Sequence, residues 1–295
     1  MLIARVIADR AALSASLAHV IDALAEQGLV SRLDVGPGGV DEIVSEAADV
    51  SDWPRFRATL EAHLPRADVL ITDHVPLVPG LFVSDMDSTM IGQECIDELA
   101  DYAGVKPQVA AITERAMQGE LDFVAALKER VALLKGLEVG VLAQCLAERV
   151  RPNPGAKTLV GTLRHHGATC LLVSGGFTAF AGPVGAMLGF DEVRANVLAQ
   201  ADGLLTGVVE GAIVDSHAKF AALEEWEAEL AIARDMTMAI GDGANDRPMV
   251  EAAGWGIAYH AKPALAAAAD ARIEHHGLDA LLWGMGLPRS AWVES

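Results

Sequence analysis

The sequence predicts an α/β protein with a doubly wound parallel sheet, a helical insertion and a small N-terminal ferredoxin-like α+β module. Three observations support this prediction. Strands and helices alternate after residue 150, which is typical of a parallel sheet covered on both faces. Residues 92–150 carry the apolar spacing of helices and contain no convincing strand. The first 73 residues suggest the order βαββαβ, which is the order of a ferredoxin-like module.

The N-terminal module is predicted from short apolar runs that two helical segments separate. Its strand candidates are LIARVIA, VSRLDV, DEIVSEA and ADVLITDH. The first helix is AALSASLAHVIDALAEQG, and the second begins at Ser51 or Asp52 with Pro54 in its first turn. We assign residues 1–76 to this module and residues 77–295 to a second domain.

The second domain begins with the strand LFVSD, and the helical insertion at about 92–150 follows it. After the insertion, ATCLLVS, TMAIGD and GIAYHA are strand candidates, and ANVLAQADGLLTGVV is expected to form a hairpin. Helices are expected up to Gly167, from Phe177, over KFAALEEWEAEL and from Asp246 to Ala253. In such a sheet ligands bind beyond the carboxyl ends of the strands, so polar residues there are the candidate site.

Composition narrows the class of partner. The 295 residues are 52% hydrophobic and 21% charged, which is typical of a globular protein. The formal net charge of −19 makes nucleic acid and anionic membranes poor partners, and no apolar run reaches membrane-spanning length. Cys95, Cys145 and Cys170 are odd in number and widely spaced, so we expect reduced thiols and a cytoplasmic protein.

Three strand ends carry polar residues in unusual density: DMDST at 85–89, SGGF at 174–177 and GDGAND at 241–246. Lys219, near the start of a helix, is a fourth fragment. Each has an ordinary explanation when taken alone: a capped turn, a tight turn, a strand–helix corner or a solvated lysine. Together they supply complementary chemistry at one edge of one sheet.

That chemistry is phosphoryl transfer assisted by a metal ion. Asp85 and Asp242 offer the oxygen ligands that suit Mg²⁺. Ser174, the Gly175 N–H and a following helix N-terminus form a cradle for phosphate oxygens, and Lys219 adds a point charge. Two carboxylates one residue apart repel each other, so the sequence predicts Mg²⁺ and a phosphoryl group between them.

The four fragments, in this order, resemble the motifs of the haloacid dehalogenase superfamily of phosphotransferases. The segments MDSTMIGQECIDELA, TERAMQGELDF, RVALLKG, SGGF, GDGANDRPM and GIAYHAKP resemble, more narrowly, the phosphoserine phosphatases. The resemblance runs from about Leu81 to the last helix. Residues 1–76 resemble, more weakly, the ACT-like module found on some members, and we expect them to stabilise the chain or to hold a homodimer.

The resemblance implies a role for each matching acidic residue. Asp85 matches the nucleophile that forms an aspartyl-phosphate, and Asp87 matches the general acid/base, whose backbone carbonyl also binds the metal. Asp242 matches the third metal ligand. Asp246 matches an acid that stands beside the metal site without belonging to its ligands. The implied metal set is therefore Asp85, Asp87 and Asp242.

The resemblance also implies how the substrate binds. Glu94 and Arg130 match the residues that hold the amino and carboxylate groups of serine. Met117 and Phe123 match apolar residues that close over the substrate. The residues that match contacts to the phosphate and the rest of the substrate are Ser174, Gly175, Lys219 and Asn245.

We therefore expect a Mg²⁺-dependent phosphatase that hydrolyses O-phospho-L-serine to L-serine and phosphate, the last step of serine biosynthesis. One alternative is the same chemistry on another small phosphomonoester, such as phosphohomoserine or phosphothreonine. An alternative of another class is a non-catalytic amino-acid sensor. The complete set of Asp85, Asp87, Lys219 and Asp242 counts against a dead scaffold.

Overall fold

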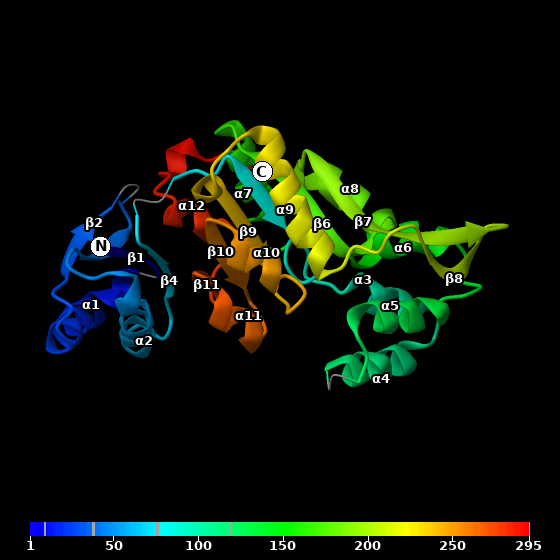
Figure 1. The fold of residues 1–295 in the computed structure, drawn as a ribbon, viewed down its shortest axis with the longest axis horizontal. Helices are drawn as coiled ribbons and strands as arrows, with labels where there is room; N and C mark the ends of the chain where they lie inside the picture. Colours follow the sequence, from blue (N-terminus) through cyan, green and yellow to red (C-terminus); the bar gives the residue numbers. More distant parts are fainter. Residues whose placement is uncertain (9, 37–38, 75–76, 118–119, 295) are drawn as a thin grey trace.

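The computed structural model describes residues 1–8, 10–36, 39–74, 77–117 and 120–294, and the side chains of 10–12, 14–15 and 117 lie outside this description. The described chain forms three lobes in a row (Figure 1): an N-terminal module, an α/β core and a helical cap. The predicted boundary at residue 76 falls outside the described residues.

The N-terminal module is an antiparallel sheet of four strands with two helices on one face. Its strands lie in the order β2-β3-β1-β4, and its elements follow the predicted order βαββαβ. Leu2, Ala4 and Val6 point toward the two helices, because alternate side chains of a strand face opposite sides. The elements are β1 (Leu2–Ile7), α1 (Arg10–Glu26), β2 (Arg32–Val35), β3 (Asp41–Ser45), α2 (Trp53–His63) and β4 (Asp68–Thr72).

The other face of this sheet is docked on the core. Ile7 and Leu70 belong to the same buried apolar cluster as side chains of the core sheet. The Asp68 carboxylate accepts hydrogen bonds from the backbone N–H groups of residues 274–276, at 2.7 to 3.3 Å. The module is therefore joined to the core by both apolar packing and buried polar contacts.

The core contains a sheet of seven strands in the order β11-β10-β9-β5-β6-β7-β8. All neighbours are parallel except β7 and β8, which form the predicted hairpin. The strands are β5 (Leu81–Ser84), β6 (Thr169–Phe177), β7 (Glu192–Ala201), β8 (Leu204–Glu210), β9 (Thr237–Gly241), β10 (Trp255–Tyr259) and β11 (Ala271–Ile273). This mostly parallel sheet confirms the predicted fold class.

Helices cover both faces of the core sheet, so β5 is buried throughout. Leu81 and Val83 pack toward α9, α10 and α11, whereas Phe82 packs toward α7, α8 and α12. The helices are α7 (Ala156–His165), α8 (Thr178–Leu188), α9 (Ser216–Leu230), α10 (Arg247–Ala252), α11 (Pro263–Ala268) and α12 (Ala280–Gly284).

The SGGF segment differs from its prediction as a turn before a helix. Strand β6 continues through it to Phe177, and α8 begins only at Thr178. The reason is pairing with β7: Phe177 lies opposite Asn196 after a shift in register, and the Asn196 side chain donates to the Gly175 carbonyl at 2.8 Å. The predicted cradle is thus built on an irregular strand end.

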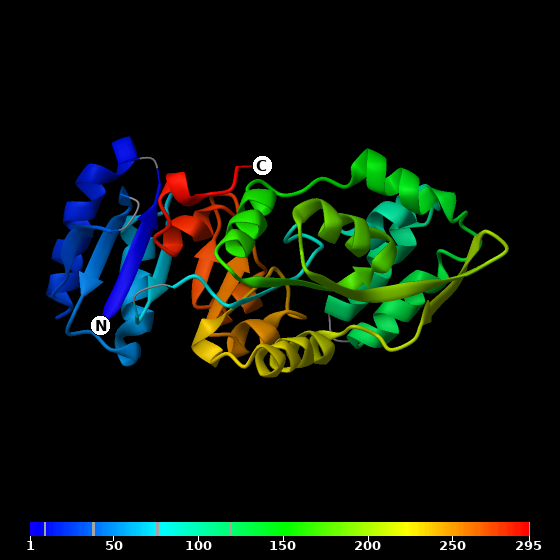
Figure 2. The ribbon, with the colours of Figure 1, turned by 90° about the horizontal axis from the view of Figure 1, so that it is seen from above.

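The insertion is helical, as predicted, with no strand among the described residues between 92 and 150. It forms a cap beside the core, and the β7–β8 hairpin reaches along it (Figure 2). Gly136 and Leu137 each share a backbone hydrogen bond of 2.8 Å with Leu205, so the hairpin is tied to the cap. The cap helices are α3 (Cys95–Tyr102), α4 (Lys106–Met117), α5 (Phe123–Ala132) and α6 (Gly140–Arg149).

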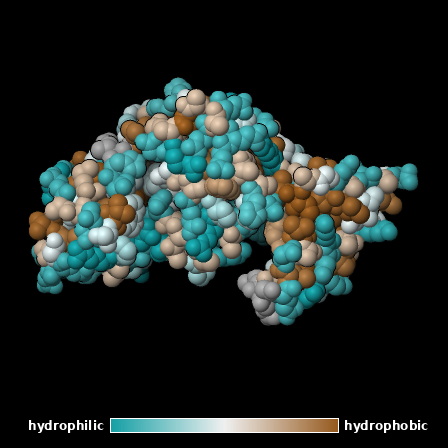
Figure 3. Space-filling view, in the orientation of Figure 1, coloured by the Kyte–Doolittle hydropathy of each residue, from teal (hydrophilic) through white to brown (hydrophobic). Residues whose placement is uncertain are grey.

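The visible surface is not uniform in character. Hydrophobic residues gather over β7, β8 and the neighbouring part of the cap, whereas the surface around α9 is mostly hydrophilic (Figure 3). Within the described ranges, no helix has both the length and the apolar character needed to cross a bilayer.

Candidate active site

A pocket of about 390 Å³ opens at the carboxyl ends of β5, β6 and β9, where the core faces the cap. The predicted residues come from five different elements or loops, and the structure brings them together. Lys219 is the exception: it does not line the pocket but lies fully buried behind it. The predicted residues that line the pocket are Asp85, Asp87, Glu94, Arg130, Ser174, Gly175, Asp242 and Asn245.

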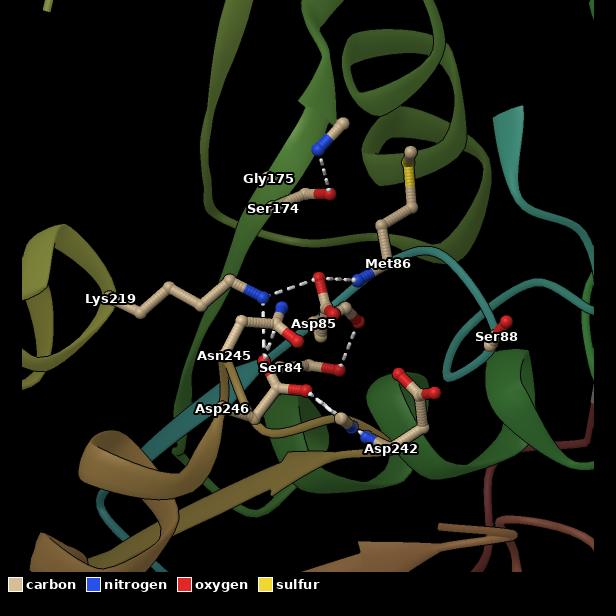
Figure 4. Close-up of polar contacts among 12 residues, drawn as sticks. Ser84, Asp85, Met86, Ser88, Ser174, Gly175, Lys219, Asp242, Asn245 and Asp246 are labelled. Atoms are coloured by element: carbon tan, nitrogen blue, oxygen red, sulfur yellow. Dashed lines mark hydrogen bonds and ion pairs between the residues drawn. The ribbon is translucent and has the colours of Figure 1, made fainter. Parts of the chain in front are cut away.

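Lys219 points from α9 into a group of carboxylates (Figure 4). Its Nζ lies 2.8 Å from Asp85 Oδ1 and 2.6 Å from Asp246 Oδ1. Burial would lower the pKa of Lys219, but the carboxylates of Asp246 and Asp85 outweigh it and raise the pKa above its usual value. The interpretation of Lys219 as an ordinary solvated lysine is therefore wrong.

Asp85 directly follows β5 and is almost fully buried. Its Oδ1 accepts hydrogen bonds from Lys219 and from the Met86 N–H at 2.7 Å, so Oδ2 remains for another partner. Burial and the Asp246 carboxylate raise the pKa of Asp85, and Lys219 opposes them. The lysine thus favours the ionised form of Asp85 against these two effects, and it binds Oδ1 so that Oδ2 is left for a ligand.

Asp246 holds the third strand end in place. Its Oδ1 binds Lys219, and its Oδ2 accepts the backbone N–H groups of Asp242 and Gly243 at 3.2 and 3.0 Å. A Cβ added at Gly241 would lie 2.3 Å from the Asp246 side chain, so only glycine fits there. The side chain of Asp246, the last residue of GDGAND, therefore binds the backbone near the start of the same motif.

Carboxylate oxygens of Asp85, Asp242 and Asp246 lie within 4.8 Å of one another and could hold a metal ion. This grouping of side chains includes Asp246 where the predicted metal set has Asp87. Because both Asp246 oxygens already accept hydrogen bonds, Asp85 and Asp242 have the freer ligand atoms. Burial, and after it Asp246, raises the pKa of Asp242 to about 6. Lys219 and the exposed Lys262, whose Nζ lies 3.8 Å from Asp242 Oδ2, do not neutralise the four buried carboxylates of Asp85, Asp87, Asp242 and Asp246, so the group attracts a further cation.

Asp87 is buried, and its Oδ1 has no hydrogen-bond partner among the described residues. Its pKa is raised to about 7, first by burial and then by the Glu94 carboxylate, while contacts with Cys95 oppose the shift. Burial and Glu94 are therefore the main causes of this shift, and the repulsion expected between Asp85 and Asp87 is seen as one of the causes that raise the pKa of Asp85.

The end of β6 forms the expected cradle beside these carboxylates. Ser174 Oγ accepts the Gly176 N–H at 2.9 Å. A Cβ at Gly175 would lie 3.0 Å from the Phe123 ring, and one at Gly176 would lie 2.9 Å from Asp87 Oδ2. A side chain at either position would therefore press against a neighbouring residue, and glycine allows this close packing.

Sequence reasoning missed Asn196, which holds this strand end in position. The buried Asn196 side chain donates to the Gly175 carbonyl and accepts the Val214 N–H, each at 2.8 Å. The only signal in the sequence was an asparagine inside a strand candidate, which is unfavourable there unless its amide is fully paired.

The cap side of the pocket carries the two predicted head-group residues. Glu94 Oε1 accepts a hydrogen bond from Ser88 Oγ at 2.7 Å, across a turn in which Ser88 adopts a φ of 55°. Arg130 donates from Nε to the Ala126 carbonyl at 3.2 Å, which leaves its other N–H groups for a ligand. Burial lowers the pKa of Arg130, and Asp97 and Glu94 oppose that shift.

The remaining predicted contacts also fall near the pocket. Asn245 lines it, and its amide lies 3.5 Å from Asp246 Oδ1. Phe123, at the start of α5, lines the opposite wall. The Met117 side chain lies outside the described residues, so its expected contact stays a prediction.

Comparison with known proteins gives the following similarities. The sequence pattern of haloacid dehalogenase-like hydrolases matches residues 82–251. The chain is 42% identical over 264 residues to phosphoserine phosphatase SerB2 of Mycobacterium tuberculosis, an alignment that covers 89% of this chain and 62% of that enzyme. It is 48% identical over 207 residues to the phosphoserine phosphatase of a Polaromonas species, covering 68% of this chain and 88% of that one.

Among solved structures, the chain is similar to a probable phosphoserine phosphatase from Vibrio cholerae in its unliganded form. The TM-score is 0.78 at 32% identity, and the superposition covers 98% of this chain and 87% of the other. The likeness therefore extends over the N-terminal module as well as the core and cap.

Proposed function

The chain belongs to the haloacid dehalogenase-like hydrolase family, and from that premise we propose that it hydrolyses O-phospho-L-serine to L-serine and phosphate. The observation that carries this proposal is the composition of the pocket. Asp85 and Asp87 line the same 390 Å³ space as Glu94 and Arg130. A phosphate fits beside the first pair, and the ammonium and carboxylate of an amino acid fit the second.

Asp85 is the proposed nucleophile. Attack by a carboxylate on phosphorus forms an aspartyl-phosphate and splits the hydrolysis into two displacements. Lys219 favours the ionised form of Asp85 and binds its Oδ1, so Oδ2 is the proposed attacking oxygen. The bond between phosphorus and the serine oxygen breaks as the bond from Asp85 forms.

Asp87 is the proposed general acid and base. The serine alkoxide is a poor leaving group, so a neutral carboxylic acid must donate a proton to it. A pKa of about 7 keeps a large fraction of Asp87 protonated near neutral pH. Once Asp87 has given up that proton, the same carboxylate takes one from the water that cleaves the aspartyl-phosphate.

Mg²⁺ is the proposed cofactor. The donors fit it: Asp85 and Asp242 supply carboxylate oxygens, and the Asp87 backbone carbonyl is the proposed third protein ligand. When bound, the ion would neutralise phosphate oxygens and orient the phosphoryl group. Asp246, with Lys219, positions Asp242 from behind.

The phosphate cradle is proposed to consist of Ser174 and Gly175, with Lys219 supplying positive charge through Asp85 and Asn245 closing one side. Ser174, Gly175 and Asn245 line the same pocket as Asp85 and Asp87, which supports this assignment. The fixed N–H and hydroxyl donors stabilise charge on the phosphoryl oxygens without having to reorient.

Arg130 and Glu94 are proposed to select the amino-acid end of the substrate. A planar guanidinium pairs with a carboxylate through two parallel hydrogen bonds, and Glu94 can accept from an ammonium group. Phosphoserine brings a carboxylate into a strongly acidic pocket, so one cation on the cap must face it. Among the described residues, Arg130 and Lys262 are the cations that line the pocket; Lys262 lies beside Asp242, which leaves Arg130 for the carboxylate.

We also propose the division of the chain into an ACT-like module at 1–76 and a phosphatase domain at 77–295, with the cap at about 92–150. The module is proposed to stabilise the chain or to support a homodimer. The three cysteines are buried and free, which supports a reducing, cytoplasmic compartment.

A phosphate-release assay over a panel of phosphomonoesters tests the proposed function. The panel contains phosphoserine, phosphothreonine, phosphohomoserine and p-nitrophenyl phosphate, each with Mg²⁺. We expect kcat/KM to be highest for phosphoserine: p-nitrophenyl phosphate lacks the ammonium and carboxylate that Glu94 and Arg130 would bind, and phosphothreonine and phosphohomoserine each carry one more carbon. Higher kcat/KM for phosphothreonine or phosphohomoserine would assign the site to that ester, and no release from any of them would overturn a phosphatase.

A further inference from the structure

A second cleft, of about 690 Å³, lies between the N-terminal module and the core. It is lined by residues of α2 in the module and of α11 and β11 in the core. In Figure 1, α2 lies on the side of the module that faces α11 and β11. The described lining of the cleft shares no residue with the active-site pocket. Trp255 begins β10, so the cleft is at the opposite end of the sheet from Asp242.

Two arginines from different lobes face this cleft. Arg57 comes from α2 and Arg272 from β11. Arg57 donates a hydrogen bond to the Asp270 backbone carbonyl, and this bond joins the module to the core. Burial lowers the pKa of Arg57, and the charge of Arg272 lowers it further. The carboxylates of Glu61 and Asp270 oppose that shift. Both arginines line the same cleft, so an anion bound between their guanidinium groups would lessen the repulsion between them.

The acidic residues around the cleft are already engaged. Glu61 pairs with Arg272 at 3.1 Å, and Asp270 accepts the Gly256 N–H at 2.8 Å. Two further acids pair with residues outside this contact: Glu251 with Arg247 at 2.8 Å, and Asp73 with His74 at 2.7 Å.

Hydrogen-bond donors, by contrast, are left over. Arg272 Nε is buried and has no partner among the described residues. The same is true of the indole N–H of Trp255, a side chain that is only 7% exposed. Buried donors are seldom left without an acceptor in native proteins. Two donors on residues that line the cleft therefore lack an acceptor, and a negatively charged acceptor would suit the two arginines.

We propose that this cleft binds the oxyanion group of a small metabolite, a carboxylate or a phosphate, between Arg57, Arg272 and the Trp255 indole. Its volume is in the range of small-molecule sites, about 300–1,000 Å³. A guanidinium binds either group through two hydrogen bonds. Because the two arginines come from different lobes, a bound anion also connects the module to the core. The proposal does not depend on the reaction catalysed at the other end of the sheet.

The test follows the indole N–H signals of the full chain by ¹H–¹⁵N NMR during titration with sodium phosphate and, separately, with succinate. The chain has five tryptophans. The indole signal that disappears in Trp255→Phe is that of Trp255. If this variant does not fold, Trp→Phe variants at the other four positions assign the remaining signal to Trp255 by elimination. Trp292, whose N–H donates to the Leu287 carbonyl at 3.0 Å, is the internal reference. We expect a saturable shift of the Trp255 signal and none at Trp292.

Variants separate this cleft from the active site, which phosphate also enters. The titration of the Trp255 signal gives a Kd for the anion. Arg57→Gln and Arg272→Gln should each raise this Kd by about tenfold or more. Arg66→Gln, an exposed arginine of the same module, should leave it unchanged. A shift with phosphate alone identifies a tetrahedral ligand group, and a shift with succinate a carboxylate. No saturable shift with either anion, or a shift that both arginine variants retain, would overturn the proposal.

Discussion

Two regions of this molecule bury charged side chains, and they do so differently. In the active site, Lys219 and Asp246 have no exposed surface. Where the N-terminal module meets the core, Arg5 and Asp68 are each only 2% exposed. Burying a charge is unfavourable unless it is paired and hydrogen-bonded, so each region must compensate for it.

At the junction with the module, the compensation is complete. Asp68 accepts backbone N–H groups of residues 274–276 and pairs with His276 Nδ1 at 2.7 Å. Arg5 pairs with Glu42 at 2.6 Å and donates to the Gly284 carbonyl at 2.5 Å. Each buried charged group in these contacts therefore has several hydrogen-bond partners. They fasten the module to the core without a ligand.

In the active site, the compensation is incomplete. Lys219 is shared by Asp85 and Asp246, while Asp242 and Asp87 keep raised pKa values and Asp87 Oδ1 lacks a described partner. We infer that a buried cluster whose charged groups are all paired stabilises the fold. A buried cluster with more carboxylates than cations is suited to bind a ligand, and the predictions below test this distinction.

The largest effect is expected at the nucleophile. Asp85→Asn keeps the size of the side chain and removes the attacking charge, so turnover of phosphoserine should fall by roughly 10³-fold or more. Beryllium fluoride, which mimics an acyl phosphate, should bind the wild type only. Circular dichroism should show an unchanged fold. A folded variant that keeps substantial turnover would show that Asp85 is not the nucleophile.

The next effect concerns substrate selection on the cap. Arg130→Ala should raise KM for phosphoserine by an amount equivalent to about 2–4 kcal/mol, because a charge-assisted pair with the carboxylate is lost. Hydrolysis of p-nitrophenyl phosphate, which has no carboxylate, should change little. Arg115→Ala is the control, since Arg115 is an exposed cap arginine that pairs with Glu129. Equal losses on both substrates would assign Arg130 to the fold or to the phosphate.

At the junction, the expected effect is on stability alone. Asp68→Ala leaves backbone N–H groups of residues 274–276 without an acceptor, so the free energy of unfolding should fall by about 2–4 kcal/mol. Urea denaturation measures this, with Glu46→Gln, at an exposed ion pair with Arg32, as the control. The kcat for phosphoserine should stay unchanged under folding conditions. A lower kcat would mean that the module helps to shape the active site.

The smallest effect is a pH dependence of the metal-free protein. The pKa values of Asp87 and Asp242 are raised to about 7 and about 6. Their folded forms hold protons more tightly than the unfolded chain, so this stability is fully present below about pH 4 and is lost as pH rises toward 7. In EDTA, Tm should therefore fall by about 2–6 °C between pH 5 and 8.

A double variant separates this effect from the general repulsion of a chain with net charge −19. The double variant Asp87→Asn/Asp242→Asn should show a smaller fall of Tm between pH 5 and 8, because it lacks the two carboxylates whose pKa values are raised. Mg²⁺ binds ionised carboxylates, so its stabilisation of the wild type should grow as pH rises. A Tm gain from Mg²⁺ that is the same at pH 5 and 8 would contradict these assignments.

The sequence was informative where the chemistry is local. DMDST, SGGF and GDGAND each place functional groups at one strand end, and the parallel sheet brings such ends together. Contacts between distant segments could not be read in this way. Asp68 is more than 200 residues from its amide partners, and the lengthening of β6 depends on Asn196 in the next strand.

The electrostatics of the site depend on the same long-range geometry. The shift at Asp87 involves Glu94, which a turn at Ser88 brings close, and burial by the cap adds to it. Lys219 could be placed near the phosphate by the order of the motifs, but its complete burial follows only from the packing of α9 on the sheet. Arg57 and Arg272 come from two different lobes, and no local sequence pattern indicated that they line the same cleft.

The need for a cation in the incomplete cluster can be tested most directly by removing metal. Protein treated with EDTA and desalted is assayed for phosphate release from phosphoserine, before and after Mg²⁺ is added back. We expect turnover to fall to background and to recover fully with Mg²⁺, because the carboxylates around the phosphate are tolerated only beside a cation. Full turnover in EDTA would contradict the central claim.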